Sequence, residues 1–263
     1  MKRTHLVLLL GLILGCLASI PPQRPTLYII GDSTVRNGSG KGSDGLWGWG
    51  SVIHAYFDTT RIRIENQAIG GRSSRTFLTE GRWDKIMATL KPGDFVMMQF
   101  GHNDGGAIND TTRARGSIKG ISNETEEIDN MLTKKHEVVH SYGWYMRKYI
   151  NDTKAKGATP IVCSLVPRNV WKNGNLERGT ESYGKWAAES AQSEGAFFID
   201  LNEIVARKYE SGYDEAKLKA EFFPTDHTHT NLGGAKLNAA SVIEGLQQLK
   251  NCPLNQYVVL SEK

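Results

Sequence analysis

The sequence has few cysteines, no block of like charge and only one long hydrophobic run, and each shortage excludes a class of protein. Its three cysteines are widely separated, which excludes zinc modules built on closely spaced cysteine pairs. No run of five or more like charges occurs and the formal net charge is +4, so nucleic-acid binding is not indicated. With 39% apolar and 23% charged residues over 263 positions, the chain should form a soluble globular protein with a sizeable core.

The one long hydrophobic run lies at the N-terminus. Lys2 and Arg3 precede an apolar stretch over residues 6–14, which is the pattern of a secretory leader and is too short to span a bilayer. We assign residues 1–20 to this leader and residues 21–25 to a proline-rich linker. The segment before Cys16 resembles a bacterial lipobox, in which Cys16 carries a lipid anchor, and ordinary cleavage near Ala18 is the alternative. The sequence thus predicts a secreted, periplasmic or lipid-anchored protein that contacts a bacterial membrane only through Cys16.

Two cysteines, Cys163 and Cys252, remain outside the leader. They could pair in an oxidising compartment. The alternative is two buried free thiols, because Cys163 lies within an apolar strand pattern. Neither cysteine stands beside a plausible base, so we expect no catalytic role for them.

Strand and helix patterns alternate along residues 26–263, which we read as one catalytic domain. Such alternation predicts a three-layer α/β/α, flavodoxin-like fold with a central five-stranded parallel sheet. Right-handed crossovers bring the carboxyl ends of parallel strands to one edge, where such sheets bind ligands. The expected strands cover residues 26–30, 61–65, 95–100, 159–166 and 196–199, and the expected helices lie near residues 47–57, 77–90, 138–154, 183–194, 201–211 and 231–249. Residues 105–135 show no periodicity and are read as an insertion over the active face.

A serine and a late Asp-x-x-His pattern carry the chemistry. Ser33 follows the first strand and Gly31, and Asp226 and His229 lie three residues apart before the last helix. At this spacing the carboxylate can bind Nδ1–H of the imidazole and leave Nε2 to take the serine proton. His227 is a neighbour of this pair, and the alternative role of Asp226 is to cap a helix. We expect His102, in a turn after the third strand, to pack structurally.

Acyl transfer also needs donors for the oxyanion. Gly71 and Asn103 follow the second and third strands, so with the Ser33 amide they can converge at the same edge of the sheet. Read singly, Gly71 and Asn103 are ordinary turn residues. We expect no metal and no cofactor, although His227 and His229 have the spacing of a ligand pair.

This order of Ser, Gly, Asn and Asp-x-x-His resembles the SGNH (or GDSL) hydrolase superfamily. The match is closest to its rhamnogalacturonan acetylesterase branch, through Gly31-Asp32-Ser33-Thr34, residues 66–74 and 80–83, Phe100-Gly101-His102-Asn103-Asp104 and Asp226-His227-Thr228-His229. The resemblance covers about residues 26–245. It implies that Ser33 is the nucleophile, His229 the base and Asp226 its orienter, and that Gly71, Asn103 and the Ser33 amide form the oxyanion hole. The insertion at residues 105–135 matches no motif of the family.

The resemblance implies removal of acetyl groups from acetylated rhamnogalacturonan, a pectin backbone. Galacturonate units are anionic, so arginines near the strand ends, Arg72, Arg75 and Arg168, are candidates for substrate binding. The alternative for each is an ordinary solvated or helix-pairing arginine. An esterase for other glycans, lipids or small esters and a non-catalytic glycan-binding protein are the competing hypotheses for the whole chain.

Overall fold

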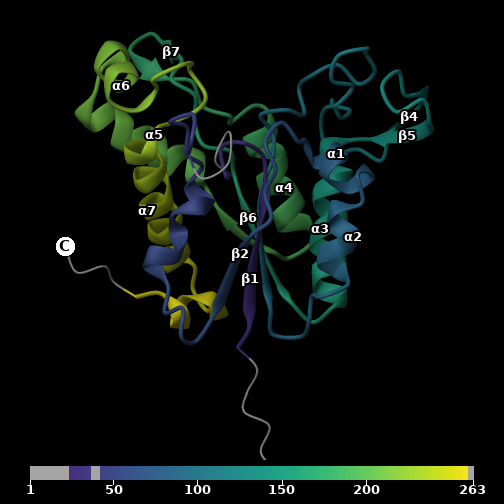
Figure 1. Cartoon of the computed structure of the whole chain (residues 1–263), viewed down its shortest axis with the longest axis horizontal. Coiled ribbons are helices and arrows are strands. Elements are labelled where there is room, and N and C mark those ends of the chain that lie inside the picture. Colours follow the sequence, from purple (N-terminus) through teal and green to yellow (C-terminus); the bar gives the residue numbers. More distant parts are fainter. Residues whose placement is uncertain (1–23, 37–41, 260–263) are drawn as a thin grey trace, which may run out of the picture.

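The chain builds its core around a parallel sheet whose five strands lie in the order β2-β1-β3-β6-β9 (Figure 1). The structure is a computed structural model and describes residues 24–36 and 42–259. All four pairings between neighbouring strands are parallel, as the alternating pattern predicts. The strands are β1 (Thr26–Gly31), β2 (Arg63–Asn66), β3 (Phe95–Gln99), β6 (Thr159–Cys163) and β9 (Phe197–Ile199).

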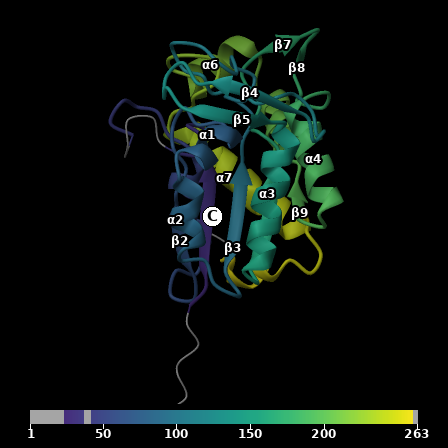
Figure 2. The ribbon, with the colours of Figure 1, turned by 90° about the vertical axis from the view of Figure 1, so that its right-hand side faces the viewer.

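Helices cover both faces of the sheet, which confirms the three-layer arrangement. Successive β1 side chains point to opposite faces: Leu27 and Ile29 pack with the α5 and α7 side, and Tyr28 and Ile30 with the α3 and α4 side. Figures 1 and 2 show these two helical layers on either side of β1 and β3. The helices are α1 (Ser74–Thr79), α2 (Arg82–Met87), α3 (Tyr142–Ala155), α4 (Tyr183–Ser193), α5 (Leu201–Gly212), α6 (Glu215–Phe222) and α7 (Leu232–Gln248).

Two of the expected helices do not form as single α-helices. The helix expected near residues 77–90 is divided into α1 and α2 by Gly81, whose φ of 68° breaks the right-handed helical path. The helix expected over residues 47–57 is a pair of short 3-10 turns, η1 (Trp49–Ser51) and η2 (Ile53–Tyr56). A further 3-10 turn, η3 (Pro253–Tyr257), follows α7.

The insertion and the residues directly after it form a β-hairpin that the sequence pattern does not reveal. Strand β4 (Thr125–Asp129) pairs antiparallel with β5 (His136–His140), so α3 starts at Tyr142 and not at Val138. Ser141 caps α3 by accepting a hydrogen bond from the Trp144 amide, which explains the break. A smaller hairpin joins β7 (Trp171–Lys172) to β8 (Asn175–Leu176). Both hairpins lie at the end of the molecule where the sheet strands terminate (Figure 1).

The two remaining cysteines are buried free thiols, Cys163 at the end of β6 and Cys252 after α7. Burial raises the pKa of each thiol, so neither is poised to act as a thiolate. The expected leader, Cys16 and most of the linker fall outside the described residues. Within the described ranges, no helix has the length and apolar character needed to cross a bilayer.

Candidate active site

Ser33 lies in a tight turn directly after β1. Gly31 allows this turn, because a Cβ there would lie only 2.6 Å from both the Gln99 carbonyl oxygen and Cγ2 of Val35. The backbone N–H groups of Val35 and Arg36 donate to the Asp32 carbonyl and close the turn at 3.2 and 3.0 Å. The turn leaves Ser33 half-buried at the carboxyl edge of the sheet.

A buried chain of polar side chains holds this turn in place. Asp32 Oδ1 accepts hydrogen bonds of 2.8 Å from both the backbone N–H and the hydroxyl of Thr34. The Thr34 hydroxyl in turn accepts from Gln99 Nε2 at 2.7 Å, and Gln99 Oε1 accepts from Trp49 Nε1 at 2.9 Å. Because Gln99 ends β3, these bonds tie the serine turn to the neighbouring strand. No sequence pattern indicates this network, because Thr34, Trp49 and Gln99 are far apart along the chain.

Ser33, His229 and Asp226 form one hydrogen-bonded chain. Ser33 Oγ lies 2.8 Å from His229 Nε2, and His229 Nδ1 lies 2.7 Å from Asp226 Oδ2. Asp226 can only accept as a carboxylate, which assigns the ring proton to Nδ1 and leaves Nε2 to accept from the serine. The other carboxylate oxygen accepts from the Thr228 and His229 amides at 2.7 and 2.8 Å. Neighbouring His227 is exposed at the surface.

The Asp226 carboxyl stays ionised in this setting. Partial burial raises the pKa of Asp226. Hydrogen bonds from the His229 amide, the His229 ring and the Thr228 amide lower this pKa, and together they outweigh the effect of burial. The net pKa is below its ordinary value. An anionic partner held by two backbone amides can orient the imidazole and stabilise it when it becomes protonated.

Ser33, Gly71 and Asn103, the predicted oxyanion donors, differ in how their N–H groups are bonded. In the described part of the chain, the backbone N–H groups of Ser33 and Gly71 have no hydrogen-bond partner. Gly71 has a left-handed φ of 77°, which favours glycine there. Asn103 donates from Nδ2 to the Arg72 carbonyl at 2.9 Å, which fixes the amide against the Gly71 turn and leaves its second N–H available.

Two titratable side chains follow β3, of which His102 is half-buried and Asp104 is buried. His102 has no hydrogen-bond partner for either ring nitrogen among the described residues, and burial lowers its pKa to about 4. Asp104 accepts from the Ser74 amide at 3.1 Å and from the hydroxyls of Ser74 and Ser117. Burial nevertheless raises its pKa to about 7. The lowered pKa keeps the His102 ring neutral at pH 7, and His102 lines a pocket together with Asn103 and Arg168.

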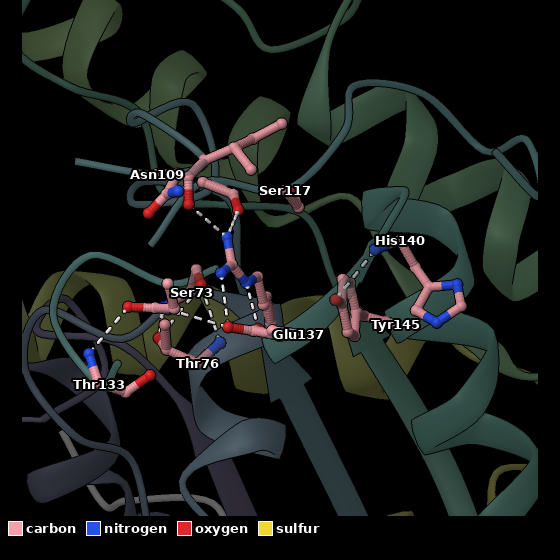
Figure 3. Close-up of polar contacts among 12 residues, drawn as sticks. Ser73, Thr76, Asn109, Ser117, Thr133, Glu137, His140 and Tyr145 are labelled. Atoms are coloured by element: carbon pink, nitrogen blue, oxygen red, sulfur yellow. Dashed lines mark hydrogen bonds and ion pairs between the residues drawn. The ribbon is translucent and has the colours of Figure 1, made fainter. Parts of the chain in front are cut away.

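Of the three predicted substrate-binding arginines, Arg75 lies elsewhere. Its side chain is 0% exposed and pairs with Glu137 of β5, with 2.6 Å between Nε and Oε1. Its Nη1 also donates to the carbonyls of Ile108 and Gly116 in the insertion. Arg75 therefore anchors the insertion to α1 and has no surface to offer a substrate. Figure 3 shows the Glu137 carboxylate beside Ser73 and Thr76 at the start of α1.

The other two arginines line two different pockets near the candidate site. Arg72 lines a pocket with Gly71 and pairs with Glu80 at 3.0 Å. Arg168 is exposed, donates to the His102 carbonyl at 3.2 Å and lines a pocket that also contains Asn103. Arg115, from the insertion, borders both pockets, and Arg113 borders the first. The sequence interpretation missed these two because the insertion has no periodicity that would orient its side chains.

The chain is similar to several known proteins. The family model described as GDSL-like Lipase/Acylhydrolase family matches residues 29–237. The rhamnogalacturonan acetylesterase of Emericella nidulans is 32% identical over 223 residues, covering 84% of each chain. A Bacillus subtilis protein named "Probable rhamnogalacturonan acetylesterase YesY" is 30% identical, covering 89% of this chain and 97% of that one. The crystal structure of the Bacillus subtilis protein YxiM superposes with a TM-score of 0.68 at 25% identity, over 86% of this chain and 56% of that chain.

Proposed function

Because this chain belongs to the GDSL-like lipase/acylhydrolase family and is an ester hydrolase, we propose that it removes acetyl groups from acetylated rhamnogalacturonan. The observation that carries the mechanism is the continuous hydrogen-bonded chain from Ser33 through His229 to Asp226. It is supported by the backbone N–H groups of Ser33 and Gly71, which have no partner among the described residues. The names of the two relatives supply the substrate.

In the proposed first step, Ser33 Oγ attacks the acetyl carbonyl while His229 Nε2 takes the serine proton. The carbonyl oxygen becomes an oxyanion that the N–H groups of Ser33, Gly71 and Asn103 stabilise. Collapse of this intermediate breaks the bond to the sugar oxygen, which receives the proton from His229. The sugar leaves with a free hydroxyl, and an acetyl group remains on Ser33.

In the second step, His229 takes a proton from a water molecule, which attacks the acetyl-enzyme at the same carbonyl. The same donors stabilise the second oxyanion, and its collapse returns the proton to Ser33 and releases acetate. Asp226 stays ionised throughout, because its hydrogen bonds favour the carboxylate. The proposed cycle uses water, side chains of the protein and the backbone N–H groups of Ser33 and Gly71.

The test is acetate release from acetylated rhamnogalacturonan, acetylated xylan and a small aryl acetate, with Ser33→Ala as the control. The proposal expects preferential release from rhamnogalacturonan and none from the variant. Equal or faster release from xylan or the aryl ester would leave the mechanism in place and remove the pectin assignment. Binding to pectin without release of acetate from any ester would favour a glycan-binding protein.

We also propose that the enzyme is exported, since a polymeric pectin substrate lies outside the cell. This proposal rests on the leader pattern of residues 1–20. Mass spectrometry of the mature N-terminus would distinguish a lipid-modified Cys16 from cleavage near Ala18. An intact Met1 on protein recovered from the native host would refute export.

A further inference from the structure

A pocket of about 420 Å³ lies directly beside Gly71, one of the proposed oxyanion donors. Three arginines line it: Arg72 from the turn after β2, and Arg113 and Arg115 from the insertion. We call it the arginine pocket. Because Gly71 belongs to both the pocket wall and the proposed oxyanion hole, a sugar bound here would be next to the sugar whose ester is cleaved.

The arginine pocket carries more positive charge than its own carboxylate balances. Glu80, the acidic residue of its lining, pairs with Arg72 at 3.0 Å and also with Arg82 at 2.6 Å. No carboxylate among the described residues lies within ion-pair distance of Arg113 or Arg115. The two guanidinium groups from the insertion are therefore available to an anion.

The loop that carries both arginines is held by its own hydrogen bonds. Asp110 Oδ1 accepts from the backbone N–H groups of Thr112, Arg113 and Ala114 at 2.9, 2.6 and 2.8 Å. These backbone bonds lower the pKa of the Asp110 carboxyl to about 2. Asp110 thus orders the loop through the backbone and forms no ion pair with either arginine in the described part of the chain.

Arg115 is fixed against the proposed oxyanion hole. Its Nη1 donates to the Gly71 carbonyl at 3.1 Å, and its side chain passes closely over Gly71 and Gly106. A Cβ at either glycine would lie 3.5 Å from the arginine, in van der Waals contact. Burial and the charge of Arg113 lower the pKa of Arg115. A bound anion would relieve the repulsion between these two guanidinium groups.

We propose that Arg113 and Arg115 form a carboxylate-binding subsite, which selects glycans with a uronate beside the acetylated sugar. Guanidinium groups bind carboxylates in a bidentate manner, and unpaired forks beside a reactive centre suit a fixed anionic neighbour. Leu132, 44% exposed in the β4–β5 turn, lines the same pocket and offers an apolar contact for a sugar ring face. This proposal rests on the proposed function and adds the residues that determine specificity.

The test compares an acetylated oligosaccharide that has free uronate carboxylates with the same material after its carboxyl groups have been reduced. We expect Arg113→Gln and Arg115→Gln each to lower the ratio of kcat/KM for the acidic over the reduced substrate at least about tenfold, because a hydrogen-bonded charged contact is lost. Arg113 has no contact with Gly71, so Arg113→Gln should raise KM for the acidic substrate and leave kcat unchanged. Arg207→Gln on α5, 74% exposed, is the matched control and should keep the wild-type ratio.

Unchanged ratios in both variants would overturn the subsite. If the wild-type protein hydrolyses an aryl acetate but neither oligosaccharide, the proposed function has failed, and calorimetry with oligogalacturonate decides the subsite alone. Wild-type binding that Arg113→Gln abolishes would support the subsite without that function. Absence of binding to the wild-type protein would refute it.

Discussion

The dependence of His229 on Asp226 gives the sharpest quantitative prediction. In Asp226→Asn, the backbone N–H groups of Thr228 and His229 still require an acceptor, so the amide oxygen should keep the position of Oδ1. The new NH₂ group then faces His229 Nδ1 at the 2.7 Å position that Oδ2 occupies. Two donors cannot share that contact, so the ring must carry its proton on Nε2.

A proton on Nε2 prevents His229 from accepting the serine proton. We expect kcat to fall by a factor of about 10⁴, as is typical when the partner of a triad histidine becomes an amide. This corresponds to about 5.5 kcal/mol of transition-state stabilisation. The fold should be retained, because Asn keeps the shape of the side chain and both backbone hydrogen bonds.

The assay is the steady-state rate with an aryl acetate, together with circular dichroism to check folding. Asp214→Asn is the matched control, because Asp214 also accepts from the amide three residues later, Lys217, at 2.9 Å, but has no histidine partner. If the kcat of Asp226→Asn stayed above one-tenth of the wild-type value, the loss of transition-state stabilisation would be less than about 1.36 kcal/mol. That result would refute the reasoning.

Three further predictions test the surroundings of the site. Asn103→Ala should lower kcat by a factor of about 10²–10³ with little change in KM, because it removes one oxyanion donor. A rise in KM with an unchanged kcat in steady-state kinetics would contradict this role. Glu137→Gln should destabilise the fold by about 3–5 kcal/mol, since it leaves the buried Arg75 uncompensated, and a melting temperature equal to that of the wild type would contradict this. Asp104 has a folded pKa of about 7, above its unfolded value, so its contribution to stability is greatest at acid pH and is lost between about pH 4 and 7. The melting temperature of the wild type relative to Asp104→Asn should therefore fall across that interval, and a constant difference would exclude a raised pKa.

The catalytic part of the candidate site could be predicted from sequence because its signals are local. Ser33, Gly71 and Asn103 each follow a strand that the apolar pattern identifies, and a parallel sheet brings such positions together. The separation of three residues between Asp226 and His229 likewise sets their contact within one turn. These inferences needed only strand ends and short spacings.

Contacts between distant residues were not accessible in this way. The buried pair of Arg75 and Glu137 joins residues 62 apart, and nothing in the pattern around either residue indicates a partner. Arg75 follows a glycine turn at a strand end just as Arg72 does, so the sequence could not tell a buried anchor from a residue at the site. The hairpin of β4 and β5 was missed because its exposed strands lack a regular apolar alternation.

The anchoring role of Arg75 links the insertion to the chemistry. Its guanidinium binds Glu137 of the hairpin and the carbonyls of Ile108 and Gly116, which lie on either side of the loop that carries Arg113 and Arg115. Gly116 directly follows Arg115, so the same side chain that fixes the hairpin also fixes the backbone beside the arginine pocket. Arg75 lies in the first turn of α1, which starts three residues after Gly71. The buried start of α1 therefore positions both the loop with Arg113 and Arg115, which would select the substrate, and the Gly71 turn, which would bind the oxyanion. Loosening this anchor should impair substrate selection and catalysis together.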